Sequence, residues 1–141
     1  MYRCEDLKRE HVDAVVDLCR AEGYGSYTED NEKTWRALTS PGSCTLVALS
    51  DDAVVGFVHM MSDGEIQAFL PMVLVAREHR RRGIGRTLIK EAFSRCGGKY
   101  LNLLAEEDAR GFYRSFPLRE FAGYRIHPQF DKDGQSKQQP V

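Results

Sequence analysis

The sequence predicts an α/β fold built on a mixed, mostly antiparallel central sheet. Apolar segments at 44–49, 53–61 and 65–75 are separated by short Asp and Gly turn signals, which is the pattern of an antiparallel meander. A helix pattern at 84–96 then leads to a further apolar segment at 100–104. Strands joined through a helix run parallel with a right-handed crossover, so the last pair of this sheet should be parallel.

The N-terminal part predicts one strand and two helices. Residues 2–6 are expected to form the strand, and one helix face is formed by Val12, Val15, Val16 and Cys19. Gly23 ends this helix. Thr28 is the expected N-cap of the second helix, from which Trp35 and Leu38 should point inward, before the sequence "SPG" at 40–42 ends it.

The meander contains two turns and one expected irregularity. Asp51-Asp52 and Asp63-Gly64 supply the turns, the second as a two-residue hairpin signal. Pro71 lies inside the third segment, where it removes a hydrogen-bond donor from the ladder. We therefore expect this strand to be irregular at Pro71.

The C-terminal part predicts shorter elements. After Gly97-Gly98 we expect a buried strand at 100–104 and a short helix at 106–116 that stops before Pro117. A last strand at 120–128 and a polar, disordered tail at 131–141 should follow. Residues 1–130 are expected to form a single domain.

Length and composition indicate a globular enzyme-sized domain. The 141 residues include 42% hydrophobic and 29% charged side chains, with a net charge of −1. This charge does not favour a nucleic-acid-binding protein, and no signal peptide or membrane-spanning run is evident, so we expect a cytoplasmic protein. Four cysteines without metal-ligand spacing are expected to be free thiols, and no metal is expected.

The segment "RRRGIGR" at 80–86 stands between an apolar strand and a helix. A helix N-terminus carries unpaired N–H groups, and glycines allow a phosphate close approach, so this turn predicts a phosphate or pyrophosphate site. The lysine of a Walker A loop and the third glycine of a dinucleotide fingerprint are both missing. The expected ligand-binding residues here are Arg80, Arg81, Arg82, Gly83, Ile84, Gly85 and Arg86. The alternative is a glycine-containing turn with solvated arginines.

The pattern Arg80-x-x-Gly83-x-Gly85 resembles the R/Q-x-x-G-x-G/A motif of the GCN5-related N-acetyltransferase (GNAT) family. The likeness extends to the flanking strand and helix, and to Ala109 and Tyr113, which resemble an A-x-x-x-Y segment of this family. The resemblance implies helices on both faces of the sheet and a splayed parallel pair of strands. It also implies acetyl-CoA as the cosubstrate.

The resemblance further implies roles for individual residues. The pantetheine arm of acetyl-CoA would pair with the strand at Val73, Leu74 and Val75, and the acetyl group would pass directly to an amine in a ternary complex. An N–H group near Val73 would stabilise the oxyanion, and Tyr113 would donate to the leaving thiolate. Glu106 and Pro117-Leu118 depart from the family's usual residues around this tyrosine.

The general base and the acceptor pocket are less defined by the sequence. Glu65 is the first candidate for the base, and the alternatives are Asp63, Glu22, Glu29 and a water held by Gln67. His59 is either a structural histidine or a cleft residue. Tyr24, Tyr27, Glu29 and Asp30 are candidates for an amine-binding loop.

The resemblance implies an N-acetyltransferase, and we expect its acceptor to be a small primary amine. The alternatives are acetylation of a protein N-terminus or lysine, and a non-catalytic acyl-CoA sensor. Nucleic-acid binding through the residues 77–86 is disfavoured by the net charge, and no membrane partner is expected. The short C-terminal part leaves room for a homodimer in which a partner completes the sheet edge.

Overall fold

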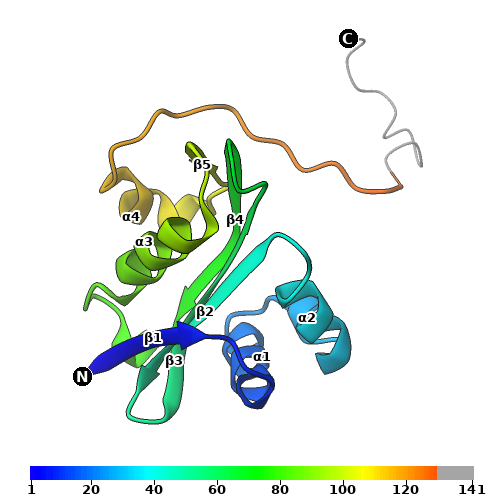
Figure 1. Ribbon diagram of the computed structural model, residues 1–141, viewed down its shortest axis with the longest axis vertical. Coiled ribbons are helices and arrows are strands. Elements are labelled where there is room, and N and C mark those ends of the chain that lie inside the picture. Colours follow the sequence, from blue (N-terminus) through cyan, green and yellow to red (C-terminus); the bar gives the residue numbers. More distant parts are fainter. Residues whose placement is uncertain (130–141) are drawn as a thin grey trace. The chain divides into compact units, whose positions relative to one another are not determined.

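The computed structural model describes residues 1–129, and the chain divides into two compact units, residues 1–103 and 104–141. The first unit contains a five-stranded sheet in the order β1-β2-β3-β4-β5 (Figure 1). The strands are β1 (Tyr2–Asp6), β2 (Ser43–Ser50), β3 (Ala53–Ser62), β4 (Gln67–Val75) and β5 (Tyr100–Asn102). Neighbours from β1 to β4 are antiparallel, and β4 and β5 are parallel, which confirms the predicted fold class.

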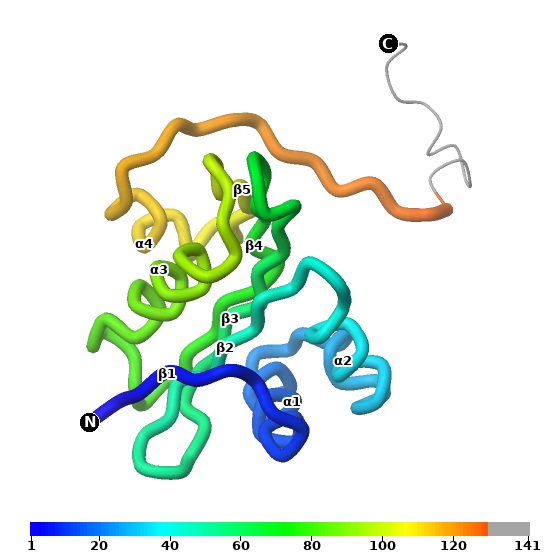
Figure 2. Tube along the Cα trace, in the orientation of Figure 1, coloured from blue at the N-terminus to red at the C-terminus, as the bar shows by residue number. Residues whose placement is uncertain are grey.

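Helices cover both faces of this sheet. Figures 1 and 2 show α1 (Val12–Ala21) and α2 (Asn31–Leu38) on one side and α3 (Ile84–Cys96) on the other. The alternation of β3 explains this arrangement, because Phe57 packs in one core cluster with Val15 of α1. The adjacent Gly56 faces α3, where a Cβ atom would lie 3.5 Å from Leu88 Cδ1. The tightest contact of this Cβ atom would be with β4, at 3.0 Å from the Leu74 carbonyl oxygen, so a larger residue here would crowd the β3–β4 pair.

The second helix begins two residues later than the sequence predicts. Asp30, not Thr28, is its N-cap, and Asp30 Oδ1 accepts hydrogen bonds from the backbone N–H groups of Glu32 and Lys33 at 2.9 and 3.4 Å. The Thr28 hydroxyl instead donates to the Gly25 carbonyl at 3.0 Å, which closes the short η2 turn (Gly25–Tyr27). Both residue types can cap a helix, so composition alone does not decide between them.

The cap assignment predicts a stability difference. Asp30→Ala should lower the free energy of unfolding by about 1 kcal/mol, because two N–H groups of α2 lose their acceptor. Thr28→Ala is the matched control and should cost clearly less. Urea unfolding of both variants measures the difference, and a larger loss in Thr28→Ala would contradict the assignment.

The inward side of α2 also differs in part from the prediction. Leu38 is buried as expected, whereas Trp35 is only half-buried. The Arg9 guanidinium carbon lies 5.1 Å from the centre of the Trp35 ring, and Thr34 occupies the buried position beside it. Helical spacing permits either residue to face inward, and the smaller one is the one that is covered.

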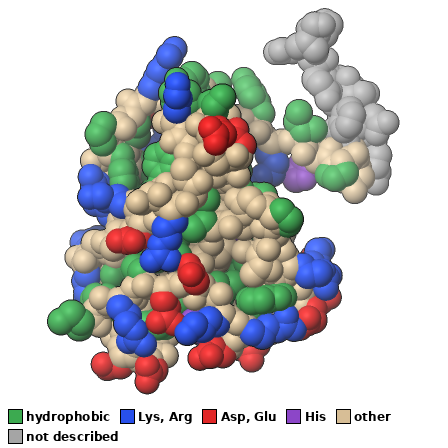
Figure 3. All heavy atoms as spheres, in the orientation of Figure 1, with side chains coloured by type: hydrophobic (Ala, Val, Ile, Leu, Met, Phe, Trp, Pro, Cys, Tyr) green, Lys and Arg blue, Asp and Glu red, His purple; other side chains and the backbone are tan. Residues whose placement is uncertain are grey.

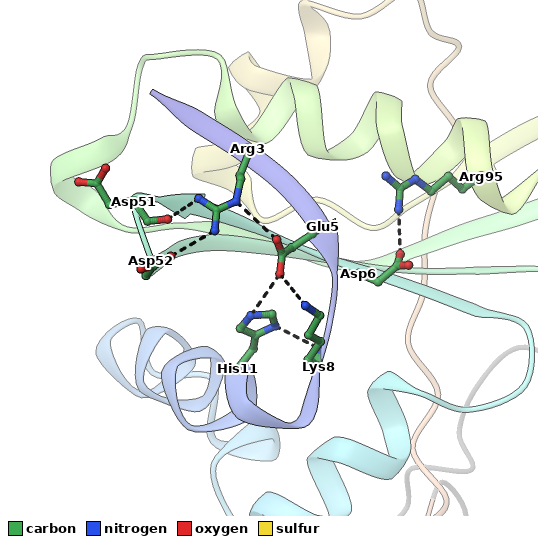
Figure 4. A network of polar contacts seen from close by, with 8 residues as sticks. All are labelled: Arg3, Glu5, Asp6, Lys8, His11, Asp51, Asp52 and Arg95. Atoms are coloured by element: carbon green, nitrogen blue, oxygen red, sulfur yellow. Dashed lines mark hydrogen bonds and ion pairs between the residues drawn. The ribbon is translucent and has the colours of Figure 1, made fainter.

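Charged side chains surround the edge strand β1 (Figure 4). Arg3 donates to the Asp51 carbonyl at 2.6 Å, and Glu5 lies within ion-pair distance of Lys8 and His11. Arg95 of α3 pairs with Asp6 at 2.8 Å, which links the helix to this strand. Charges on an edge strand oppose pairing with other chains, so this edge is protected.

The connection from β3 to β4 is longer than a two-residue turn. Asp63 Oδ1 accepts from the N–H groups of Glu65 and Ile66 at 2.8 and 2.7 Å, so the loop extends over residues 63–66 and β4 begins at Gln67. The predicted start at residue 65 was wrong because the N–H groups of Glu65 and Ile66 donate to the Asp63 carboxylate instead of to the backbone of β3.

The irregularity predicted at Pro71 is confirmed. His59 lies opposite Met72 and Met61 opposite Phe69, so three steps along β4 match two steps along β3. Leu70 and Pro71 together therefore face the single residue Met60, which is the geometry of a β-bulge.

The second unit contains the 3₁₀ helix η4 (Glu107–Ala109) and α4 (Arg110–Arg114), which confirm the predicted short helix. The predicted strand at 120–128 was wrong, since residues 117–127 form neither strand nor helix. Its apolar residues are exposed and no strand of residues 1–129 pairs with it, and apolar alternation without a partner does not make a strand. The predicted tail at 131–141 lies outside the described residues.

The strand expected at 100–104 is shorter and less buried than predicted. It ends at Asn102, and Tyr100 is 58% exposed. As the last strand of the sheet, β5 has one neighbour only, so its side chains are not covered from both sides. Within residues 1–129, none of the helices has the length and apolar character needed to cross a membrane.

Candidate active site

The sheet opens between its two parallel strands. β5 pairs with Gln67, Ala68 and Phe69 only, while β4 continues beside β3 to Val75. The last six residues of β4 therefore have one edge that β5 does not cover. This is the splay that the family resemblance implies, and it begins next to the bulge at Leu70 and Pro71.

The register of β3 and β4 decides which backbone groups face the opening. The Ala76 N–H donates to the Val55 carbonyl at 2.8 Å, across the β3 side of the strand. In an antiparallel ladder the direction alternates, so Leu74 also faces β3, while Val73 and Val75 face the open edge. The Val75 carbonyl accepts from Arg80 Nε at 2.8 Å. Val73 thus offers both an N–H and a carbonyl to a ligand, and Val75 offers an N–H.

Leu74 has a different position from the other two predicted strand residues. Its backbone faces β3, and its side chain is 8% exposed within the core cluster around Phe57. Leu74 therefore packs β4 against the core cluster and does not face the open edge. Its direct pairing with a ligand stays a prediction that this geometry does not favour.

A tight turn leads from β4 to α3. Arg81 and Gly83 have positive φ angles of 64° and 81°, and Gly83 is the N-cap of α3 without any side-chain cap. A Cβ atom at Gly83 would meet no atom within 4 Å. The first-turn N–H groups of Ile84, Gly85 and Arg86 point out of an uncapped helix, which is an arrangement that binds anions.

The arginines before α3 differ in their contacts, and their roles in anion binding stay predictions. Arg80 is held by the Val75 carbonyl and by Glu22, whose Oε2 lies 3.4 Å from the guanidinium. Arg82 donates to the Tyr2 hydroxyl at 2.8 Å. Arg81 is exposed beside the turn. On the face shown in Figure 3, basic and acidic side chains are interspersed.

Tyr2 is a site residue that sequence reasoning missed. Its hydroxyl accepts from Arg82 and lies 3.0 Å from His79 Nδ1, so it holds both sides of the turn. A pocket of about 130 Å³ opens here and is lined by Tyr2, Cys4, Ala48, Arg82, Gly83, Ile84 and Thr87. A first-strand tyrosine gives no local signal for a contact that spans 80 residues.

The acidic candidates for a base lie away from Val73 or are already engaged. Glu65 is exposed in the loop before β4, and Val73 lies roughly 20 Å further along that strand at about 3.3 Å per residue. The N–H groups of Ile66, Glu65 and Gln67 hold the pKa of Asp63 below its ordinary value. Glu29 pairs with Lys33 at 3.6 Å. The assignment of Glu65 as the base stays an untested prediction.

His59 is buried on the α1–α2 face of the sheet, with 4% of its surface exposed. Ser40 Oγ donates to the Ala37 carbonyl at 3.1 Å, so Ser43 must donate the hydrogen of the 2.8 Å bond to Ser40. His59 Nε2 then donates to Ser43 at 3.1 Å, which fixes the tautomer with its hydrogen on Nε2. His59 Nδ1 is buried and has no hydrogen-bond partner in residues 1–129. These contacts describe a structural histidine, as one of the two sequence interpretations has it.

Burial makes His59 a source of acid instability. Desolvation lowers the pKa of His59 to about 4, below the unfolded value, so the unfolded chain binds the proton first as the pH falls. The contribution of the neutral His59 ring to the free energy of unfolding is fully present above pH 6.5, and it is lost as the pH falls towards 4. Between pH 7.5 and 5 we expect a loss of about 2 kcal/mol from this group. His59→Gln, which keeps a donor for Ser43, should remove this part of the pH dependence.

Urea unfolding at pH 7.5 and pH 5 measures the effect. His127→Gln, in which an exposed histidine is changed, is the control. Equal pH dependence in the wild type and His59→Gln would show that His59 does not titrate between these values.

Tyr113 lies in α4 of the second unit, where its ring meets Phe112 edge-to-face at 4.9 Å. It is half-buried there. The role of Tyr113 as the hydrogen donor to the leaving thiolate is still a prediction.

The four cysteines are free thiols, as predicted from their spacing. Burial raises the pKa of Cys19 to about 11, so this thiol is protonated and unreactive at neutral pH. Within residues 1–129, no group of three or more His, Cys, Asp or Glu side chains is placed to hold a metal ion.

An open strand edge beside an uncapped, glycine-containing helix N-terminus can bind an extended ligand by backbone pairing and by anion recognition. The acetyltransferase (GNAT) domain family matches residues 41–116, more than half of the chain. The chain therefore belongs to the GNAT acetyltransferase family, and the predicted resemblance is confirmed.

Individual relatives agree with this assignment. A mycothiol acetyltransferase from Parafrankia sp. (strain EAN1pec) is 35% identical over 103 residues, which cover 69% of this chain. The match covers 31% of that protein, so the chain spans about a third of its length. A solved GNAT-family acetyltransferase from Streptococcus pneumoniae TIGR4 has a TM-score of 0.71 at 26% identity, with 92% of this chain and 98% of that chain covered. An aminoglycoside acetyltransferase from an uncultured soil metagenomic sample has the same fold, with a TM-score of 0.71, 23% identity and coverage of 91% and 98%.

Proposed function

We propose that this chain transfers the acetyl group of acetyl-CoA directly to a primary amine of a small molecule within a ternary complex. The observation that carries the proposal is the open edge of β4 at Val73, which leads along one strand to the uncapped N-terminus of α3. These two features are continuous in the chain, so one extended ligand can use both.

The residues of the opening fit acetyl-CoA, which would supply the acetyl thioester. Val73 would pair with the pantetheine arm through its N–H and carbonyl, and the Val75 N–H would continue this ladder. The pyrophosphate would lie at the first-turn N–H groups of α3, where Gly83 leaves space for it. Arg81 would add charge from the turn.

Two residues of the chain would have tasks in the transfer. The Val73 N–H is placed on the open edge and would stabilise the negative charge that develops on the carbonyl oxygen. Tyr113 would donate its phenolic hydrogen to the sulfur as the carbon–sulfur bond breaks. The acceptor amine must be neutral when it attacks, and water can take the proton that it releases.

Aromatic residues favour an acceptor site on the α1–α2 face. Tyr24 and Tyr27 are partly buried against the same core cluster as Met72 of β4. Met72 precedes Val73 and lies on this face, directly opposite His59. The Parafrankia relative is named a mycothiol acetyltransferase, and this name is in keeping with a small-molecule acceptor for this chain.

The experiment is a thiol-release assay with acetyl-CoA. A panel of small primary amines is tested beside peptides that carry a free N-terminus or a lysine, and a sample without an amine gives the hydrolysis background. Release with small amines alone supports the proposal. Thiol release with peptides alone would contradict the proposal and would indicate that the acceptor is a protein N-terminus or lysine. Saturable acetyl-CoA binding without release for any amine would indicate a sensor.

A further inference from the structure

One carboxylate joins the acceptor side of the first unit to the turn before α3. Glu22 Oε2 accepts from Arg77 Nε at 3.0 Å and lies 3.4 Å from a terminal nitrogen of Arg80. The hydrogen bond from Arg77 holds the pKa of Glu22 below its ordinary value. The Glu22 side chain is 19% exposed, while those of Arg77 and Arg80 are 73% and 41% exposed. We call Glu22, Arg77 and Arg80 the clamp.

On the cofactor side, the clamp reaches the open edge of the sheet. Arg80 Nε donates to the Val75 carbonyl at 2.8 Å, while the same guanidinium meets Glu22. The planar guanidinium can serve two acceptors at once, so Arg80 links the end of β4 to the carboxylate. Arg80 lies three residues before Gly83, and its position therefore bears on the turn that forms the anion site.

On the acceptor side, a rigid helix end connects Glu22 to Tyr24. The Tyr24 N–H donates to the Cys19 carbonyl at 3.0 Å and the Gly23 N–H to the Arg20 carbonyl at 3.2 Å. Gly23 has a φ of 81°, so these contacts form a Schellman motif at the end of α1. This motif fixes Tyr24 relative to Glu22, and the η2 turn follows immediately.

We propose that Glu22 couples the binding of the cofactor's diphosphate at α3 to the ordering of the loop 24–28 on the acceptor side. The inference rests on the proposed function. A ligand that restrains the turn 77–83 also restrains the two arginines of the clamp, and through Glu22 the Schellman motif and the loop beyond it. By linkage, an ordered loop favours cofactor binding by the same factor. Glu22 is therefore a positioning residue, and its carboxylate is engaged by arginines instead of being open to an amine.

Hydrogen exchange of the loop amides tests this coupling. The Tyr27 and Thr28 N–H groups are bonded to the Tyr24 and Gly25 carbonyls at 3.2 and 3.0 Å, so their exchange reports opening of the loop. Free coenzyme A is the probe. In the wild type, saturating coenzyme A should slow exchange of these amides by about fivefold or more, the lower end of typical coupling. In Glu22→Gln this slowing should be lost.

Two further variants make the result specific. Glu78→Gln changes an exposed carboxylate beside Arg77 that is not part of the clamp and should keep the slowing. Arg80→Lys keeps the charge but cannot serve both the Val75 carbonyl and Glu22 as a planar fork, so it should lose the slowing as Glu22→Gln does. Circular dichroism of each variant shows that the fold is retained.

The outcomes separate the inference from the proposed function. Coenzyme A that binds Glu22→Gln and slows the loop amides as much as in the wild type would overturn the coupling and leave the proposed function standing. Absence of coenzyme A binding to the folded wild type would overturn both.

Discussion

Replacing Gly83 and Gly85 with glutamate should weaken coenzyme A binding by a factor of about a thousand or more. Each carboxylate would stand at the N-terminus of α3, where the first-turn N–H groups face the proposed pyrophosphate. Two like charges about 4 Å apart cost roughly 4 kcal/mol at an effective dielectric constant of 20, so one such contact corresponds to about a thousandfold weaker binding. Calorimetric titration of coenzyme A into both proteins measures the loss.

Gly83→Ala is the matched control for this experiment. A Cβ atom at Gly83 meets no atom within 4 Å, so alanine adds no steric contact, but the φ of 81° still costs about 1 kcal/mol in an L-residue. This variant should bind within about tenfold of the wild type. Equal binding in the wild type and in the folded double glutamate variant would place the anion elsewhere and remove the main support for the cofactor site.

Local sequence signals predicted most of the first unit. The helix at 84–96 followed from its apolar spacing and its two terminal glycines, and the structure places it at Ile84–Cys96. The irregularity at Pro71 followed from a missing donor, and the bulge lies there. Both predictions succeeded because the cause acts within a few residues of the effect.

Long-range contacts of the site could not be predicted in this way. Glu22 meets Arg77 over 55 residues and Tyr2 meets Arg82 over 80, and no spacing rule connects such residues. The predicted strand at 120–128 failed for a related reason, because alternation shows which side chains could share a face but not whether a neighbouring strand is present. Charged and hydroxyl side chains were therefore assigned by type alone, and the structure shows which of them pair with one another.

The same reasoning applies to the choice of helix cap and to the base. Thr28 and Asp30 are two residues apart and both are good caps, so the boundary of α2 was fixed only by the contacts of Asp30. Glu65 was placed on a strand because Asp63-Gly64 resembles a tight hairpin. The three N–H groups that Asp63 engages lengthen this loop and leave Glu65 outside β4.

Tyr113→Phe should lower the turnover number by at least about a hundredfold, while the dissociation constant of coenzyme A stays within about twofold. A phenol with a pKa of about 10 can donate its hydrogen to a developing thiolate, and phenylalanine keeps the ring but loses this donor. The edge-to-face contact with Phe112 does not need the hydroxyl, so the local packing should persist. Steady-state rates with the best amine of the thiol-release panel measure the change.

Tyr124→Phe is the control in the same unit, because Tyr124 is 82% exposed and has no predicted role. Its turnover should remain within about twofold of the wild type. A loss confined to Tyr113→Phe, together with unchanged coenzyme A binding, would identify the Tyr113 hydroxyl as the proton donor. Equal rates in both variants would mean that the thiolate leaves without a proton from α4.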